Sequence, residues 1–598
     1  MPPITRALAA ADAPTLLDAL AHAPAAAALV VGALKRAGGD HPRSHGDRKA
    51  LRLVCTQLRD AVDEATTWLE ADFEGGDAAP PTPARWPRVK ELRIIGPTLE
   101  VIVALGSETW GGLRTLRLGP SNEHIALDVP SARALAAALR RMPALRALKL
   151  RRMRLSDEAA AELFRASSAE DAPQLRLLAV TDADVSPAAV GMLAAAGWPL
   201  EELDLRFNDG LGAAHIAALL AAPAFALRRL ATSFSSLDAA SLLALANAPW
   251  PLEELDFTND NFRPAEFAPA LAALSRLSGL RKLILDHCAL SAAAFKALVE
   301  AEWPALTHFS AQGTGVKFDG PDALGAAAFA GFSALEELDL SAGIQIFTFV
   351  PLGVAGARLL ASQRWARLRT LNLSDTYLGD AGVAVLARGE WPALKVLKLE
   401  RNDLGAAALI SVANAPWPLE ELDLSRNDLS AAAAGPALVA LSRRGLRRLE
   451  VRYCKLSAAT FKALVEAAWP SLTCLKAIEA EVEFDGPHAL GAAAFAGFPA
   501  LEELVLKGMA FGDAGARLLA RRRWPRLRVL NLKFCHFGDD GAAALGRAWW
   551  PALEFLVLWG NGVEGWFSEG WYKCTHGPPW PLHANARRRA PALVDVIC

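Results

Sequence analysis

The sequence predicts an α/β solenoid, a stack of about eighteen strand–loop–helix units with a parallel sheet inside and helices outside. The chain has 598 residues, more than the ~250–300 at which a single core stops growing. The pattern Leu-x-x-Leu-x-Leu recurs at intervals of 24 to 33 residues, and apolar residues at helical spacing follow many of its copies. A repeat of this length indicates one stacked array rather than several compact domains.

The strand half of the unit is defined by the leucine pattern. In the copy that begins at Leu419, Leu422 and Leu424 point to one face of a short strand, and the residues between them point to the other. Clear copies begin at Leu113, Leu145, Leu200, Leu252, Leu280, Leu335, Leu368, Leu394, Leu419, Leu446, Leu501, Leu527 and Leu553. Weaker copies begin at Val89, Leu175, Leu227, Leu306 and Leu472.

A polar or thiol side chain often stands eight residues after the first leucine, where the chain must turn. We call this the corner position. A short amide there can bond the backbone of the turn, and a buried thiol also suits an inward corner. We therefore predict that the corner cysteines are structural. The corner position holds Asn208, Asn402, Asn427, Asn561, Cys288, Cys454 and Cys535.

The helical half of the unit often ends in Trp-Pro, directly before the next strand. Gly379–Ala387 and Gly512–Ala520 are two similar helical segments. Proline stops a helix, so the tryptophan before it is expected to fill the core between neighbouring helices. The pair occurs at Trp86, Trp198, Trp250, Trp303, Trp391, Trp417, Trp469, Trp524 and Trp550.

These motifs resemble the leucine-rich-repeat family over residues 89–562. The helical halves are similar to the ribonuclease-inhibitor and GALA subtypes, and the corner cysteines to the cysteine-containing subtype. The resemblance implies a horseshoe whose concave sheet face binds a macromolecule. A block of six repeats is duplicated at an offset of 166 residues, since Phe295–Trp303 recurs as Phe461–Trp469.

Residues 1–75 lack the repeat and are expected to form a helical N-terminal module, followed by a linker at 76–88. Their end resembles the second half of an F-box, although the usual opening Leu-Pro-x-Glu is absent. The resemblance implies binding to a Skp-type adaptor. The alternative is a helical cap on the first repeat, which any solenoid needs. The possible adaptor-binding residues are Leu53, Val54, Leu58, Val62 and Trp68.

Residues 563–598 are expected to form a C-terminal cap and tail. The chain carries no phosphate-binding loop, zinc-protease or serine-hydrolase motif, so we predict neither an enzyme nor a cofactor or metal site. The net charge of −2 gives no electrostatic case for binding nucleic acid or a membrane. The seven cysteines are an odd number and none has CxxC spacing, which favours a reducing compartment. We expect a cytoplasmic protein, with the nucleus or the ciliary axoneme as alternatives.

The predicted function is protein binding on the concave sheet face. The middle repeats present acids there, as in Glu202 and Asp204, whereas the later repeats present cations and aromatic residues. Exposed aromatic residues beside arginine are typical of interface hot spots. Two alternatives stay open: a substrate receptor of a cullin-based ubiquitin ligase, and an enzyme inhibitor of the ribonuclease-inhibitor kind. The predicted partner-binding residues are Arg448, Arg452, Tyr453, Lys476, Lys507, Lys533, Phe534, Phe555 and Trp559.

Overall fold

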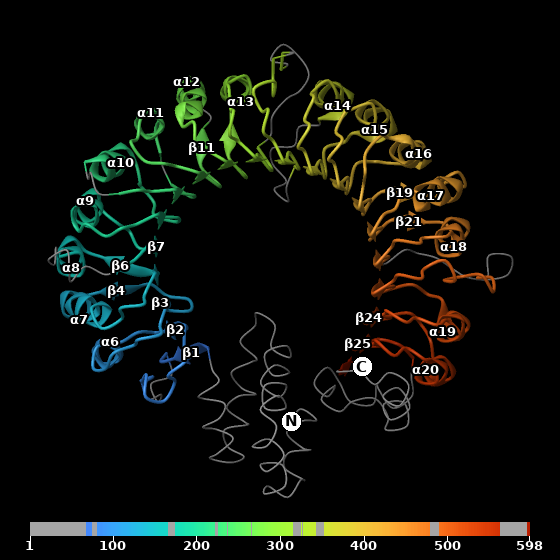
Figure 1. Cartoon of the computed structure of the whole chain (residues 1–598), viewed down its shortest axis with the longest axis horizontal. Coiled ribbons are helices and arrows are strands. Elements are labelled where there is room, and N and C mark those ends of the chain that lie inside the picture. Colours follow the sequence, from blue (N-terminus) through green and yellow to red (C-terminus); the bar gives the residue numbers. More distant parts are fainter. Residues whose placement is uncertain are drawn as a thin grey trace, which may run out of the picture. The chain divides into compact units, whose positions relative to one another are not determined.

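Two compact parts make up the chain, an N-terminal part up to Leu285 and a C-terminal part from Asp286. Each is described by itself. A computed structural model describes residues 67–74, 80–165, 174–221, 225–235, 237–262, 264, 266–314, 324–325, 327–342, 352–478, 490–562 and 595–597. Within each part, parallel strands line the inner side of a curve and helices cover its outer side (Figure 1).

In the N-terminal part, each strand of the main ladder pairs in parallel with the next one along the chain. The ladder strands are β1 (Trp68–Asp72), β2 (Glu91–Ile95), β3 (Thr115–Gly119), β5 (Ala147–Arg151), β7 (Leu177–Thr181), β8 (Glu202–Asp204), β9 (Arg229–Ala231), β10 (Glu254–Asp256) and β12 (Lys282–Ile284). The helices are α6 (Leu99–Leu105), α7 (Val129–Leu139), α8 (Asp157–Leu163), α9 (Pro187–Ala195), α10 (Ala213–Leu220), α11 (Ala239–Ala246) and α12 (Phe267–Ala273).

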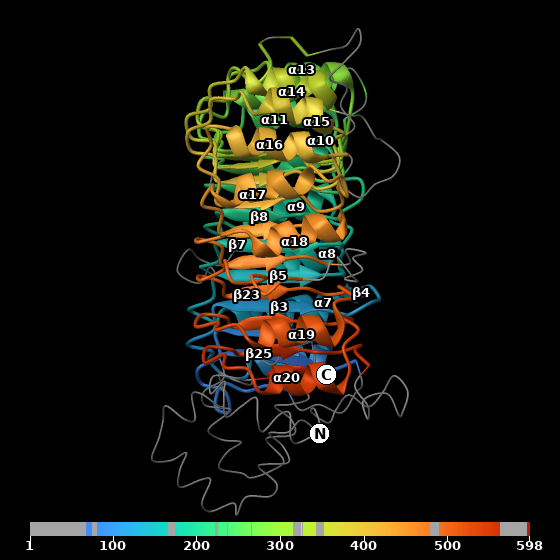
Figure 2. The ribbon, with the colours of Figure 1, turned by 90° about the vertical axis from the view of Figure 1, so that its right-hand side faces the viewer.

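The C-terminal part has the same construction, and Figure 2 shows its helices α16 to α20 stacked in chain order. Its ladder strands are β14 (His308–Ser310), β15 (Glu337–Asp339), β16 (Thr370–Asn372), β17 (Val396–Lys398), β18 (Glu421–Asp423), β20 (Arg448–Glu450), β22 (Cys474–Lys476), β23 (Glu503–Val505), β24 (Val529–Asn531), β25 (Phe555–Val557) and β26 (Asp595–Ile597). Its helices are α13 (Ala292–Val299), α14 (Gly353–Ala361), α15 (Gly379–Leu386), α16 (Ala406–Asn414), α17 (Ala434–Ser442), α18 (Ala458–Glu466), α19 (Gly512–Ala520) and α20 (Asp539–Gly546).

Strands β2 to β25 of the main ladders fall on the eighteen copies of the leucine pattern, so the α/β solenoid is confirmed. The strand leucines are buried, as in Leu203, Leu422 and Leu530. The tryptophans before proline are buried as predicted, and Trp391 stacks on Trp417 with ring centroids 5.3 Å apart. Several of these indole N–H groups find carbonyl partners: Trp417 Nε1 donates to the carbonyl of Gly389, and Trp303 Nε1 donates to that of Leu298. These rings therefore belong to the core between strands and helices.

One correction concerns the expected helical module at residues 1–75 and the linker after it. Residues 68–72 form strand β1, which pairs in register with β2, so the ladder begins before Val89. Trp68, predicted as a helical adaptor contact, is a strand residue. Trp86, within the predicted linker, is buried with the first repeats. The alternation Trp-Leu-Glu-Ala-Asp lacks the leucine pattern, which is why the sequence did not reveal this strand. Residues 1–66 lie outside the described part of the chain.

The aspartate in Gly-Asp-Ala-Gly segments connects consecutive helices. Oδ1 of Asp380, in the first turn of α15, accepts hydrogen bonds from the backbone N–H groups of Gly405 and Ala408 at the start of α16. Asp513 of α19 does the same for Gly538 and Gly541 at the start of α20. A carboxylate suits this place because the first N–H groups of a helix lack intrahelical acceptors. In both places the motif therefore ties one unit to the next.

Candidate functional site

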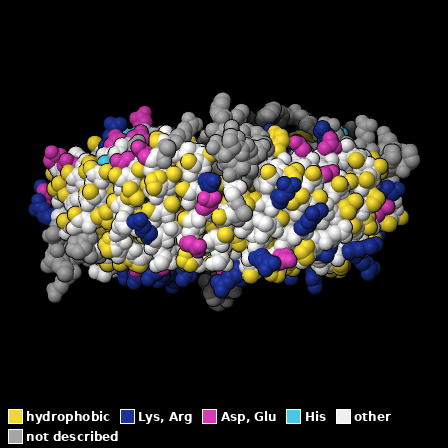
Figure 3. Space-filling view, turned by 90° about the horizontal axis from the view of Figure 1, so that it is seen from above, with side chains coloured by type: hydrophobic (Ala, Val, Ile, Leu, Met, Phe, Trp, Pro, Cys, Tyr) yellow, Lys and Arg dark blue, Asp and Glu magenta, His cyan; other side chains and the backbone are white. Residues whose placement is uncertain are grey.

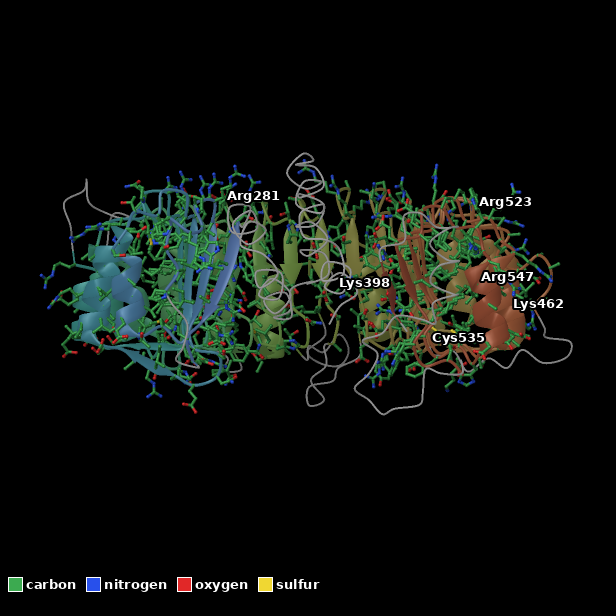
Figure 4. All side chains as sticks on the ribbon, turned by 90° about the horizontal axis from the view of Figure 1, so that it is seen from below. Arg281, Lys398, Lys462, Arg523, Cys535 and Arg547 are labelled. Atoms are coloured by element: carbon green, nitrogen blue, oxygen red, sulfur yellow. The ribbon has the colours of Figure 1, made fainter. Side chains whose placement is uncertain are left out.

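The outer and inner faces of the solenoid carry different side chains. Figure 3 looks onto the helix-covered outer face and shows hydrophobic side chains over much of it, with scattered charges. The side chains between the core leucines of each strand lie on the opposite, inner side, which we call the strand face. In Figure 4, the labelled Lys398 comes from strand β17, whereas Lys462 comes from helix α18. The predicted partner-binding residues all lie on the strand face of the C-terminal part, on or directly after strands β20 to β25.

Three of the predicted residues gather around one acid. The carboxylate of Glu450, at the end of β20, forms ion pairs with Arg448, Arg452 and Lys476. Its side chain is only 12% exposed. Lys476 also lies 3.4 Å from Glu503, and Arg448 lies 3.6 Å from Glu421. Tyr453 directly follows Arg452 in the chain and is 42% exposed.

This network changes the predicted electrostatics of the later repeats. The cations Arg448, Arg452 and Lys476 do not form a free basic patch, since each is paired with one or more acids on the neighbouring strands. Sequence reasoning missed Glu450 because it treated each strand separately. The register places Glu450 beside Asp423 on one side and Lys476 on the other, and that pairing is the signal that could have found it.

Cys474 lies on the strand face of this network rather than at a corner. Its thiol donates to Glu503 at 3.2 Å, and Arg448 donates to its sulfur at 3.2 Å. Burial, with the nearby Glu503 carboxylate, raises the pKa of the Cys474 thiol to about 12. The thiol is therefore protonated at neutral pH and acts as a hydrogen-bond donor, not as a nucleophile.

A second group of predicted residues forms a small aromatic cluster. The rings of Phe534 and Trp559 meet edge to face, with centroids 4.7 Å apart. The ammonium group of Lys533 lies 4.0 Å from the Trp559 ring centroid and 5.3 Å from that of Phe534. Phe534 is 36% exposed and Trp559 is 37% exposed. Lys507 and Phe555 are half-buried on the same face, and Phe555 is in register with Val529 of β24.

The exposed aromatic residues occupy an unusual backbone position. Tyr453 and Phe534 directly precede the corner position and have φ values of 54° and 57°. In most repeats the residue at this place is in the left-handed region, and we call it the left-handed position. Glycine adopts it without steric cost, as at Gly313 and Gly508, whereas a bulky side chain is disfavoured there. These rings therefore reach the strand face from a backbone conformation that is unfavourable for a bulky residue.

The strand face also contains a hollow of about 840 Å³ beside the Glu450 network. Polar side chains of β15 to β20 and the residues after them line it, among them Asn372, Glu400 and Arg401. Arg448 and Arg452 reach its edge, so the hollow and the network are continuous. Lys398 also lines the hollow; it is exposed and has no ion-pair partner among the described residues. A surface of this kind can accept charged and polar groups of a partner.

Buried side chains hold the corners behind this face. The Nδ2 group of Asn427 donates to the carbonyls of Leu399 and Leu424, and its Oδ1 accepts from the N–H groups of Asn402 and Leu404. The corner cysteines are buried as predicted: Cys535 Sγ donates to the carbonyl of Leu506, and burial raises the pKa of its thiol to about 12. Within the described residues, no cluster of His, Cys, Asp and Glu could hold a metal ion.

A family model agrees with the repeat assignment at two places in the chain. A family model described as Leucine Rich repeat matches residues 368–387 and 526–546. Similar solved structures include a TLR13–ssRNA13 complex, which is 18% identical over 82% of this chain and 66% of that chain, with a TM-score of 0.44. A leucine-rich-repeat protein of Leptospira interrogans is 15% identical over 77% and 91% of the two chains, with a TM-score of 0.38. The mouse RP105/MD-1 complex is 14% identical over 78% and 76%, with a TM-score of 0.46.

No curated protein matches the chain. None of the described helices combines the length and the apolar character required to cross a bilayer. The family match and the regular strand–helix geometry together identify the repeats as leucine-rich repeats.

Proposed function

We propose that this leucine-rich-repeat chain is a protein-binding scaffold that holds a protein partner against the strand face of its C-terminal part. One observation carries the proposal: Tyr453 and Phe534 are exposed aromatic residues at left-handed positions, where glycine would fit at lower cost. Neither ring contributes to the buried core. A conformational cost at a residue outside the buried core is a reason to infer a function.

The neighbours of these rings support the same proposal. The guanidinium of Arg426 lies 4.9 Å from the centroid of the Tyr453 ring, and Lys533 lies over Phe534 and Trp559. Tyrosine, tryptophan and arginine are the residue types most enriched in binding hot spots. Arg426 and Lys533 pack against the rings, so a partner would meet a pre-ordered surface. Pre-ordering lowers the entropy cost of association.

The test is a binding measurement on the full chain. A partner is first identified by affinity purification with mass spectrometry and then purified. Its dissociation constant is measured for the wild-type chain and for Tyr453→Ala, Phe534→Ala and Trp559→Ala. We expect at least one variant to bind about thirtyfold more weakly, because a hot-spot aromatic residue contributes ~2 kcal/mol or more.

Trp549→Ala provides a matched control. Trp549 follows helix α20, is 52% exposed, and is another large aromatic residue of the same part. Its removal is expected to leave the dissociation constant unchanged. If all three strand-face variants bind the partner as tightly as the wild-type chain, the proposed site is wrong.

A substrate receptor of a cullin-based ubiquitin ligase is a second candidate. It is supported by the F-box-like residues Leu53, Val54, Leu58 and Val62, which lie outside the described residues. Under this proposal, the strand face would hold the substrate and the N-terminal segment would bind a Skp-type adaptor. Co-purification with a Skp–cullin complex that is lost on Val54→Asp would support it. Retention of the complex by that variant would contradict it.

An enzyme inhibitor of the ribonuclease-inhibitor kind is a third candidate that uses the same face. It differs from a scaffold in its effect, since the activity of a bound enzyme would fall in proportion to its occupancy. A cytoplasmic location belongs to the proposal as well, with the nucleus and the ciliary axoneme as alternatives. It is supported by the four described cysteines, which are free thiols.

A further inference from the structure

The N-terminal part carries an exposed pair of aromatic residues that the sequence reasoning passed over. Phe207 and Phe234 follow β8 and β9 at consecutive left-handed positions, with φ values of 61° and 58°. Their rings stack with centroids 4.4 Å apart and an interplanar angle of 20°. Phe207 is 46% exposed and Phe234 is 40% exposed. The signal in the sequence is a phenylalanine seven residues after the first leucine in two successive repeats.

The pair is anchored to the ladder by its backbone. The N–H of Phe207 donates to the carbonyl of Ser233, and the N–H of Phe234 donates to the carbonyl of Thr258. The two rings are thus held at fixed positions on neighbouring units. They contribute little to the core, and each adopts a backbone conformation that disfavours a bulky residue. The arrangement keeps an aromatic surface at the strand face.

The charges around the pair are acidic. On the strand face of β8, β9, β10 and the three residues after each, the acids are Glu202, Asp204, Glu254 and Asp256 and the cations are Arg206 and Arg229, so two minus four gives a net charge of −2.

Both arginines are occupied by acids. Arg206 binds Asp204 through two nitrogens, and Arg229 lies between Glu202 and Glu254. Asp256 is different, because it accepts hydrogen bonds from Ser233 and Thr258 and forms no ion pair within the described part of the chain. Arg206 attracts it only at longer range.

Asp256 has a small residue as one of its neighbours in the ladder. Ala231 of β9 lies between Asp204 of β8 and Asp256 of β10, and its side chain is a single methyl group. Asp256 therefore faces a small residue across the ladder. It lies three residues before the left-handed position of its own repeat, and that position holds a phenylalanine in the two preceding repeats. Among the described residues, no lysine or arginine lies over the ring of Phe207 or Phe234. The aromatic pair and a carboxylate without an ion pair are thus linked through Ser233, which precedes Phe234 and donates to Asp256.

We propose that the Phe207–Phe234 pair is a platform for an arginine side chain presented by a protein partner. A guanidinium is planar, stacks on aromatic rings and forms hydrogen bonds to a carboxylate at the same time. The rings supply the stacking surface and Asp256 supplies the charge. A phosphate-bearing partner would be repelled by the net negative charge of this face. The platform lies in the N-terminal part and does not depend on the site proposed for the C-terminal part.

The test uses the full chain and a fluorescein-labelled peptide of nine arginines, with binding followed by fluorescence anisotropy. A peptide of nine citrullines has the same shape without the charge and serves as the uncharged control. We expect Phe207→Ala and Phe234→Ala each to weaken arginine-peptide binding about fivefold, which corresponds to ~1 kcal/mol for a cation over an aromatic ring. Asp256→Asn is expected to weaken it by a similar factor.

Two further variants separate this interaction from other causes. Phe207→Gly removes the ring and relieves the left-handed backbone, so it should lose binding without losing thermal stability. Phe207→Leu keeps an apolar side chain, so it should lose binding like the alanine variant. Tyr453→Ala is the control, because the Tyr453 ring is already covered by Arg426. It should leave peptide binding unchanged.

Several outcomes would overturn the platform. The first is equal binding of the citrulline and arginine peptides. The second is full binding by Phe207→Leu, which would indicate simple hydrophobic contact. The third is tighter binding of a single-stranded uridine oligonucleotide than of the arginine peptide, lost in Phe207→Ala. None of these outcomes bears on Tyr453, Phe534 or Trp559, so the two proposals can fail separately.

Discussion

The aromatic side chains at left-handed positions have different neighbours in the two parts of the molecule. In the N-terminal part, Phe207 and Phe234 cover each other on an acidic strand face. In the C-terminal part, Arg426 covers Tyr453 and Lys533 covers Phe534. The same backbone position thus presents an aromatic surface that is free to accept a cation in the N-terminal part. In the C-terminal part, a cation of the chain itself already covers that surface. The neighbouring cations, not the rings, decide what kind of partner each part can take.

The corners behind the two faces differ in a related way. In the C-terminal part, Asn402 and Asn427 occupy successive corners, and the amide oxygen of Asn427 accepts from the backbone N–H of Asn402. In the N-terminal part, the corner of the repeat that follows the phenylalanine pair holds Asp260, which is 2% exposed and accepts from the N–H and hydroxyl of Ser235. An asparagine can both donate and accept at a corner, whereas an ionised aspartate can only accept. The acid therefore makes this corner sensitive to pH.

The largest expected effect is the loss of a complete corner. Asn427→Ala leaves the N–H groups of Asn402 and Leu404 and the carbonyls of Leu399 and Leu424 without their amide partner. Buried groups left unpaired cost ~1–3 kcal/mol each before water enters, so we expect a loss of about 3 kcal/mol in the free energy of unfolding. Urea denaturation followed by circular dichroism measures it. Asn414→Ala, at the exposed end of α16, is the control and should cost far less.

Replacing the corner aspartate with asparagine should increase the free energy of unfolding rather than reduce it. Burial raises the pKa of Asp260 to about 8, against the opposing hydrogen bonds of Ser235. The folded state therefore holds a proton that the unfolded state releases at a lower pH. Stability from this group is present at acidic pH and is lost as the pH rises toward 8. We expect Asp260→Asn to raise the free energy of unfolding by ~1–3 kcal/mol at pH 8 and to change it little at pH 4.

Asp238→Asn is the control for the pH dependence. Asp238 caps helix α11 through Ser241, and that hydrogen bond lowers the pKa of its carboxyl group. Its contribution is present above the pKa of the unfolded state and is lost as the pH falls, so the variant should lose stability at pH 8. If Asp260→Asn and Asp238→Asn shift stability in the same direction at pH 8, the pKa of Asp260 is not raised in the folded chain and the corner comparison is wrong.

Much of this fold could be predicted from the sequence because its leucines repeat. A period of about 26 residues places Leu203, Leu422 and Leu530 on equivalent strands, and all three are buried. The tryptophans before proline and the corner asparagines follow from the same alignment of repeats. Strand β1 escaped prediction because Trp68–Asp72 lacks the leucine pattern and is identified only by its pairing with β2.

The candidate site could be predicted only in part, since a strand face is assembled from neighbouring repeats. Tyr453, Phe534 and Trp559 were found one by one, as unusual residues at outward positions. Glu450 was not, because its importance depends on cations from its own strand and from the next. Phe207 and Phe234 were missed for a similar reason. Each is an ordinary phenylalanine until the register places the two rings in contact.

The smallest expected effect is a gain in peptide affinity when the aromatic rings of the C-terminal part are uncovered. Lys533→Met removes the ammonium group over Phe534 and Trp559 and keeps most of the aliphatic side chain. If the Lys533 ammonium group blocks these rings from binding another cation, the variant should gain affinity for the arginine peptide by about twofold, since an exposed cation over a ring contributes ~0.5–1 kcal/mol.

Lys398→Met removes an exposed lysine from strand β17 that lies over no described aromatic ring, so it measures the effect of the charge alone. An equal gain in both variants would mean that peptide binding follows net charge. A gain confined to Lys533→Met would mean that the two parts differ because of a single covering side chain.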